Sequence, residues 1–286
     1  MPPVLPSRTL SADLAARARA FAAAGEAPVP LRDAATVVLL RDAASGGVEA
    51  YLLRRVKAMV FAAGMHVFPG GAVDARDADA DIAWSGPPPE DWCRPLSADA
   101  QLVRALVCAA VRETFEESGV LLAGHAPAGG GVVTDTTGED WERDRLALLD
   151  RSLAMTQLLQ RRGLVLRSAL LRPWAHWITP DFETRRYDTR FFVAALPVGQ
   201  RTRDVGGEAD RVAWVRPEEA LRRHQRGELA MLPPTVATLG DLASYPSVAA
   251  VLDDATHREI RRLLPATVIS GDEVQVLLPG DPGYPG

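Results

Sequence analysis

Three glutamates within one short segment constrain this chain more than any other feature of its sequence. Glu113, Glu116 and Glu117 are spaced i, i+3 and i+4, so an α-helix places their carboxylates on one face. Like charges at this spacing repel by about 0.2–0.5 kcal/mol per pair. Gly119 is expected to end the helix just beyond them, where the helix dipole also disfavours anions. A bound Mg²⁺ or Mn²⁺ removes both penalties, because these ions prefer oxygen ligands. The alternative is a solvated acidic helix face.

Neighbouring residues favour the metal site over that alternative. Arg112 stands four residues before Glu116, a helical spacing at which a guanidinium pairs with a carboxylate and holds its orientation. Farther upstream, Phe68-Pro69-Gly70-Gly71 forces a break in the chain. A glycine pair together with a group of carboxylates is not explained by a purely structural role.

These segments together resemble the signature of the Nudix hydrolase superfamily. Gly71, five further residues and Asp77 resemble its first half, and Arg112 to Val120 resembles its second half. Asp77 stands where the family usually has glutamate, and Thr114 where it usually has a hydrophobic residue. Residues 78–111 replace a much shorter spacer. A long insertion at this point is typical of the branch that resembles the peroxisomal coenzyme A diphosphatases.

The resemblance to this branch extends beyond the split motif. Gly64 to Gly71 is similar to its strand entering the motif, and His176 to Pro180 with Arg185 to Phe192 is similar to its second signature. The coenzyme A signature is met in part: Arg55 matches it, whereas Val60 stands where it has arginine. Coenzyme A is therefore inferred from the branch.

The resemblance implies a hydrolase that uses water to cleave a diphosphate linked to another moiety, with Mg²⁺ or Mn²⁺ as cofactor. It implies that Glu113 binds metal or takes a proton from the attacking water, and that Arg112 orients it. The metal ligands so implied are Glu113, Glu116, Glu117, the backbone carbonyl of Gly71 and, from a later loop, Glu208. A solvated loop glutamate is the alternative interpretation of Glu208.

Substrate contacts are expected from the coenzyme A signature, which lies upstream of the glycine pair, and from the second signature. The predicted substrate-binding residues are Arg55, Thr179, Arg185, Arg186 and Arg190. Arginine forms bidentate contacts with phosphate, so these side chains are expected to reach the 3′-phosphate or the diphosphate of coenzyme A. Solvated charges at a strand edge are the alternative.

The expected reaction converts coenzyme A or acyl-coenzyme A to 3′,5′-ADP and 4′-phosphopantetheine or its acyl form. Two alternatives remain: a pyrophosphatase acting on ADP-ribose or NADH, and a related ligand sensor without hydrolysis. A sensor would be expected to lack one of the carboxylates of the motif, and all three are present.

Alternating strand and helix patterns predict an α/β fold. With the resemblance, the expectation is a Nudix-type α/β/α sandwich with a mixed sheet, an insertion inside the motif and extra C-terminal helices. The expected organisation is an N-terminal helical extension (1–30), a catalytic domain (31–245) with inserts at 78–97 and 139–171, and a helix and strand extension (246–286).

Three local expectations concern the helices and the insert. Ser97 is expected to cap the helix that carries the carboxylates, and one continuous helix is expected over Glu139 to Arg161. In the insert, Trp84 and Trp92 are expected to be exposed and to serve a lid or a dimer contact, with a plain folded excursion as the alternative.

Composition narrows the partners. The chain has 286 residues and a formal net charge of −5, so it lacks the excess of basic residues typical of nucleic-acid-binding proteins. It has no apolar run long enough to span a membrane. Cys93 and Cys108 show no metal-ligand spacing and are expected to be reduced. The final residues carry no peroxisomal targeting tripeptide. The expectation is a cytoplasmic enzyme with a small-molecule nucleoside diphosphate derivative as partner, and a homodimer is also considered.

Overall fold

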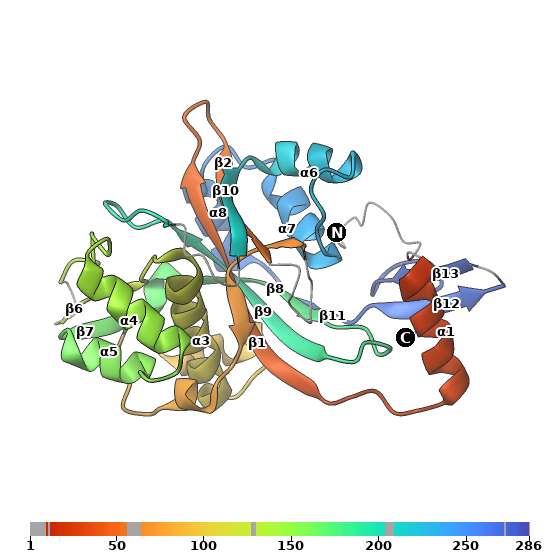
Figure 1. Ribbon diagram of the computed structural model, residues 1–286, viewed down its shortest axis with the longest axis horizontal. Helices are drawn as coiled ribbons and strands as arrows, with labels where there is room; N and C mark the ends of the chain where they lie inside the picture. Colours follow the sequence, from red (N-terminus) through yellow and green to blue (C-terminus); the bar gives the residue numbers. More distant parts are fainter. Residues whose placement is uncertain are drawn as a thin grey trace.

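The structure, a computed structural model, describes residues 10, 12–55, 64–126, 130–203, 209–271 and 273–285. A mixed eight-stranded sheet forms its centre (Figure 1), with the main strands in the order β10-β2-β1-β9-β8-β11. Strand β3 pairs with β2, and β4 pairs with β1. The strands are β1 Leu31–Asp42, β2 Val48–Arg55, β3 His66–Val67, β4 Gly70–Ala72, β8 Arg172–Ile178, β9 Arg186–Ala195, β10 Ala209–Val215 and β11 Arg262–Leu263.

Strand β1 shows that the sheet is covered on both faces. Ala35, Val37 and Leu39 are buried in one hydrophobic core, whereas Val38 and Leu40 are buried in a second. Successive side chains of a strand point to opposite faces, so a strand with several consecutive buried residues lies between two layers. The continuous apolar run of β1 therefore makes it a central strand.

Helices supply both outer layers. The first core contains residues of α3 Ala100–Ser118, α4 Glu139–Leu149 and α5 Met155–Arg161. The second contains residues of α6 Pro217–Gln225, α7 Pro233–Leu242 and α8 Val248–His257. The predicted α/β/α sandwich with extra C-terminal helices is confirmed.

The prediction of one continuous helix from Glu139 to Arg161 is wrong. Helix α4 ends at Leu149, and α5 begins at Met155. Arg151 between them adopts a left-handed backbone with φ of 64°. Such a conformation is incompatible with a right-handed helix, so the chain turns here and packs the two short helices separately.

The insert in the motif is a folded part of the core. It contains β5 Trp84–Ser85, η2 Pro89–Trp92 and α2 Cys93–Leu96, and η1 Ala75–Ala78 leads into it. Strand β5 pairs in parallel with β7 Leu164–Arg167, which also pairs with β6 Ala123–His125 in a separate three-stranded sheet; η3 Ser168–Leu170 follows β7. The two predicted inserts, 78–97 and 139–171, are thus joined by strand pairing.

The expectation of exposed tryptophans in the insert is wrong. Trp92 is only 6% exposed, and its ring centre lies 6.0 Å from that of Phe192 on β9. Trp84 is half-buried, and its indole nitrogen donates a hydrogen bond to the carbonyl of Pro87 at 2.8 Å. Both side chains pack inward because the insert supplies apolar surface to the α3 side of the sheet, so they support the folded excursion over a lid or dimer contact.

Segments from near the two ends of the chain form a small terminal lobe beside the sheet, defined here as α1 Ala12–Ala24, β12 Ala266–Ser270 and β13 Glu273–Leu277 (Figure 1). The hairpin β12–β13 packs against α1 through a small core containing Ala18, Phe182 and Val274. Within the described ranges, no helix combines the length and apolar character needed to cross a membrane.

Candidate active site

Helix α3 carries the predicted carboxylates, and both of its ends are defined. At its start, the side chain of Asp99 accepts a hydrogen bond from the backbone nitrogen of Leu102 at 2.8 Å. The prediction that Ser97 is the cap is wrong, because Ser97 instead ends α2 in a left-handed conformation. Gly119 ends α3 with φ of 73°, as predicted.

The two glycines of β4 bring backbone directly against α3. The amide of Gly70 donates a hydrogen bond to Glu117 Oε2 at 2.8 Å. A Cβ atom on Gly71 would lie 2.4 Å from Glu113 Oε1, and one on Gly70 would lie 2.6 Å from the carbonyl oxygen of Ala35. Only glycine permits this approach on both sides of the strand. The structure therefore brings the glycine pair and the glutamates, far apart in sequence, into one site.

The guanidinium of Arg112 binds the acidic groups together. It donates to both oxygens of Asp77, at 2.9 and 2.8 Å. It also donates to Glu113 at 2.7 Å and to Glu116 at 3.2 Å, the predicted helical pair. Burial lowers the pKa of Arg112, but Asp77, Glu113 and Glu116 outweigh this effect and raise it above its ordinary value. Arg112 is thus a fixed cation among carboxylates.

Asp77 connects the two ends of the long insert. It lies in η1 at the start of the insert, is 2% exposed, and also accepts a hydrogen bond from the backbone amide of Asp74 at 2.8 Å. Its bidentate contact with Arg112 ties the start of the insert to α3, which follows it. Aspartate in place of the usual glutamate retains an acidic partner for Arg112.

Burial and like charge make the carboxylates unfavourable on their own. Burial, followed by repulsion from Glu113, raises the pKa of Glu116 to about 7. Among the described residues, no three acidic, histidine or cysteine side chains converge closely enough to chelate one ion as they stand. Arg112 holds Glu113 and Glu116, and Gly70 holds Glu117. The donors are nevertheless all oxygen, which fits Mg²⁺ or Mn²⁺.

A second arginine supports the end of α3. Arg145 on α4 is 2% exposed and donates to the backbone carbonyl of Glu116 at 2.7 Å. Glu142 holds it with an ion pair of 2.7 Å, and Arg203 also pairs with Glu142. A cation near the last turns of a helix offsets the negative end of its dipole. Arg145 is not predicted from the sequence, because no spacing rule connects α4 with Glu116.

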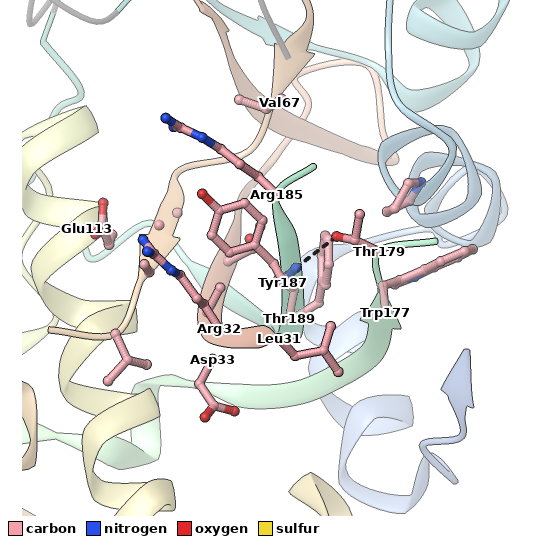
Figure 2. A pocket seen from close by; sticks show the side chains of 18 of the residues that line it. Leu31, Arg32, Asp33, Val67, Glu113, Trp177, Thr179, Arg185, Tyr187 and Thr189 are labelled. Carbon is pink, nitrogen blue, oxygen red and sulfur yellow. Dashed lines mark hydrogen bonds between the residues drawn. The ribbon is translucent and has the colours of Figure 1, made fainter. Parts of the chain in front are cut away.

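A cleft of about 2050 Å³ begins at these carboxylates and runs along the sheet to the terminal lobe. Its floor is one face of the central sheet. Helices α6, α7 and α8 cover this face near the end of β1 but leave it open near the start of β1. Figure 2 shows Glu113 at one side and the floor beside it. The floor residues are Arg32, Ala34 and Thr36 of β1, Tyr187, Thr189 and Phe191 of β9, and Trp177 of β8.

Three of the predicted substrate-binding residues line this cleft: Arg55, Thr179 and Arg185. The hydroxyl of Thr179 accepts a hydrogen bond from the backbone amide of Tyr187 at 3.0 Å (Figure 2). Thr179 therefore fixes the strand that carries Tyr187. Their contact with substrate stays a prediction.

The structure does not bring Arg186 and Arg190 to the cleft, which corrects their assignment. Even-numbered residues of β9 point away from the side that carries Tyr187. Arg186 is buried and donates to the carbonyl of Thr179 at 3.2 Å. Arg190 is buried and binds Asp33 at 2.6 Å. Both guanidinium groups stabilise the sheet.

Three further polar residues, Glu208, Glu183 and His176, have different positions. Glu208, the predicted additional metal ligand, lies outside the described residues. Glu183 lines the cleft and forms an ion pair with Arg17 at 2.9 Å. His176 contacts Asp188 within the sheet, as expected of a structural histidine.

Comparison with known proteins agrees with this arrangement. A family model described as the NUDT19 Nudix domain matches residues 94–242. The acyl-coenzyme A diphosphatase NUDT19 of Homo sapiens is 30% identical over 279 residues, covering 83% of this chain and 72% of that protein. This chain belongs to the Nudix hydrolase family. The NUDT19 of Gallus gallus is similar, with 29% identity over 83% of this chain and 73% of its own length.

A solved structure agrees with the Nudix assignment. The Nudix hydrolase from Alicyclobacillus acidocaldarius has a TM-score of 0.66 and 31% identity, covering 78% of this chain and 96% of that chain. The chain is thus an enzyme of the Nudix type, and its Nudix box is split by the folded insert that Asp77 and Arg112 close.

Proposed function

We propose that this Nudix hydrolase cleaves the diphosphate of coenzyme A or an acyl-coenzyme A, with Mg²⁺ or Mn²⁺ as cofactor. The products are 3′,5′-ADP and 4′-phosphopantetheine or its acyl form. The supporting observation is that the α3 carboxylates and Gly71 meet at the beginning of a long cleft, which suits an extended nucleotide substrate. The names of similar proteins from Homo sapiens and Gallus gallus contain acyl-coenzyme A diphosphatase, which supports the substrate class.

The residues that would hold the metal are the three glutamates of α3 and the backbone carbonyl of Gly71. When bound, a divalent ion neutralises charge on the phosphoryl oxygens and lowers the pKa of bound water. Since Arg112 now engages Glu113 and Glu116, their carboxylates must turn from it to bind the ion. The bidentate contact of Arg112 with Asp77 does not involve these carboxylates, so it would still hold α3 against η1.

Proton transfer is assigned to Glu113. Its carboxylate lies beside Gly71 at the cleft, where the attacking water has access. The hydrogen bond from Arg112 fixes the orientation of this carboxylate. Gly70 performs the corresponding role for Glu117 through its backbone amide.

The metal assignment is tested with Glu117→Gln. This change keeps the size of the side chain but weakens its affinity for a hard cation, so we expect kcat to fall by about 100-fold or more. Circular dichroism and thermal unfolding should remain close to those of the unaltered enzyme. Glu219→Gln, an exposed glutamate of α6, serves as the matched control. Near-normal turnover of Glu117→Gln would overturn the assignment.

The substrate class is tested by product identification. Coenzyme A, an acyl-coenzyme A, ADP-ribose and NADH are each incubated with the enzyme and Mg²⁺, and products are identified by mass spectrometry. Release of 3′,5′-ADP with the highest kcat/KM supports the proposal. Faster cleavage of ADP-ribose or NADH would replace it by the alternative pyrophosphatase, and binding without cleavage would indicate a sensor.

The cytoplasm remains the proposed location. Cys93 and Cys108 are both free thiols, which suits a reducing compartment.

A further inference from the structure

Two arginines on the cleft floor carry charge that the described part of the chain does not neutralise. Arg32 and Arg185 line the cleft and are exposed, and their guanidinium groups form no hydrogen bond or ion pair with any described residue. The acidic side chains near them already have partners. Asp33 binds Arg190 at 2.6 Å, and Glu183 binds Arg17 at 2.9 Å. A chain with a net charge of −5 thus keeps two unpaired cations beside its catalytic carboxylates.

The two arginines lie on either side of one aromatic ring. Arg32 of β1 stands opposite Tyr187 of β9 in the parallel register, so their side chains share a face of the sheet. Arg185 precedes Tyr187 by two positions and lines the same cleft. Figure 2 shows both guanidinium groups flanking the ring, and they extend with its hydroxyl toward the side where Glu113 lies.

The backbone that carries this ring is fixed by two hydrogen bonds to Thr179. The amide of Tyr187 donates to the hydroxyl of Thr179 at 3.0 Å, and the amide of Thr179 donates to the carbonyl of Tyr187 at 3.0 Å. Tyr187 is half-buried, with Trp177 and Thr189 beside it on the floor. An ordered aromatic between two guanidinium groups offers a flat apolar surface next to donors for an anion.

We propose that Arg32, Tyr187 and Arg185 form a second phosphate subsite, separate from the site of diphosphate cleavage. Its ligand is a phosphate monoester on the ribose of the substrate, which is the 3′-phosphate in coenzyme A. The two arginines hold this group through charge-assisted hydrogen bonds, and the ring of Tyr187 packs against the attached nucleoside. This inference rests on the proposed function, because it names what distinguishes the preferred nucleotide.

Position and charge separate this subsite from the diphosphate site. The α3 carboxylates would hold the metal that binds the diphosphate, whereas Arg32 lies on β1 and Arg185 lies just before β9. Coenzyme A carries a third phosphate that ADP-ribose and NADH lack. A phosphate monoester carries about −1.5 to −2 charge near neutral pH and has three strong acceptor oxygens. Two guanidinium groups match that charge and geometry.

A binding experiment tests the subsite without any turnover. Isothermal titration with Mg²⁺ compares 3′,5′-ADP with 5′-AMP, which lacks the 3′-phosphate. We expect 3′,5′-ADP to bind about 10- to 100-fold more tightly. Arg32→Ala and Arg185→Ala should each remove most of this difference, and Arg32→Lys should retain part of it, because lysine keeps the charge but not the planar fork. Arg261→Ala, an exposed arginine outside the cleft, is the control.

Kinetics with coenzyme A and 3′-dephospho-coenzyme A give the second readout. In Arg32→Ala, we expect the ratio of kcat/KM for coenzyme A to that for the dephospho form to fall about tenfold or more, mainly through KM for coenzyme A. Equal losses on both substrates would overturn the subsite. So would equal affinity of the unaltered enzyme for 3′,5′-ADP and 5′-AMP.

The two proposals fail in different ways. If coenzyme A is not cleaved but 3′,5′-ADP is preferred and the arginine variants lose that preference, the proposed function is wrong and the subsite stands. If coenzyme A is cleaved without any effect of the 3′-phosphate, the subsite is wrong and the proposed function stands.

Discussion

At the scale of single residues, Glu116 has the environment that conflicts most with its charge. Burial and the neighbouring Glu113 raise its pKa to about 7 from an ordinary value of 4.5. Because folding favours the protonated form, the stability that this proton contributes is fully present below about pH 4.5. It is lost as the pH rises to about 7. A divalent cation needs the ionised carboxylate, so below this pKa it competes with the proton.

This competition predicts a pH-dependent effect of metal on stability. Below pH 7, Mg²⁺ affinity should fall by up to about tenfold per pH unit, so saturating Mg²⁺ should raise Tm more at pH 8 than at pH 6. Glu116→Gln should remove most of the pH difference, whereas Glu219→Gln should retain it. Differential scanning calorimetry with and without Mg²⁺ measures both. An equal shift at the two pH values in the unaltered enzyme would contradict the raised pKa of Glu116.

Sequence reasoning identified local pairs at this scale but not tertiary ones. Arg112 and Glu116 are four residues apart on one helix, so helical geometry alone predicts their contact. Arg145 reaches Glu116 from another helix, and no spacing rule indicates that. Strand alternation places Arg186 and Tyr187 on opposite faces of β9. The sequence does not show which of these faces borders the cleft.

At the scale of elements, the two adjacent glycines of β4 are required for different reasons. Gly70 is required for the packing of β4 against β1, and Gly71 is required for the position of Glu113. A Cβ atom on Gly70 would meet backbone, at 2.6 Å from the carbonyl oxygen of Ala35 and 2.8 Å from the Cα of Thr36. The three atoms nearest to a Cβ atom on Gly71 all belong to the carboxylate of Glu113, whose side chain can move. The same substitution should therefore have different consequences at the two positions.

Gly70→Ala should lower the free energy of unfolding by about 1–3 kcal/mol, because the β1–β4 pairing must open. Gly71→Ala should leave Tm nearly unchanged but reduce kcat about tenfold or more, because it displaces Glu113. Thermal unfolding and the diphosphatase assay are measured on both variants. Equal losses of stability, or normal turnover of Gly71→Ala, would refute this division.

The split motif shows what element-level prediction could and could not supply. The resemblance at Gly71, Asp77 and Arg112 located the insertion from sequence. Its folded state depends on the parallel pairing of Trp84 with Leu166, and neither strand length nor local pattern indicates such a distant partner. Two-residue strands carry too little periodic signal to be recognised.

At the scale of the whole molecule, the terminal lobe forms one wall of the cleft. Leu14 of α1 and Val276 of β13 both line it, and Val274 is buried in the small core between these elements. The alternation of strands and helices predicted the sandwich. It could not predict the contact between α1 and β13, because nearly the whole chain separates them.

A charge placed in that small core should detach the lobe and leave the sheet intact. Val274→Asp is expected to accelerate hydrogen exchange in α1 and to raise KM several-fold, while β9 remains protected. Ile269→Asp in the same hairpin is the control, because Ile269 is 41% exposed. Exchange mass spectrometry distinguishes the outcomes. Loss of protection in β9 together with α1 would show that the lobe and the sheet unfold as one unit.

The pairing of α1 with β13 also sets an order for biosynthesis. Helix α1 emerges from the ribosome early, and its partner follows after almost all other described elements. At ~5–20 residues per second, the delay is on the order of 10 to 50 s. During that time the carboxylates of α3 can already be in place while one wall of the cleft is missing. The nascent enzyme can therefore bring the carboxylates of α3 and the glycines of β4 together before it completes its cleft.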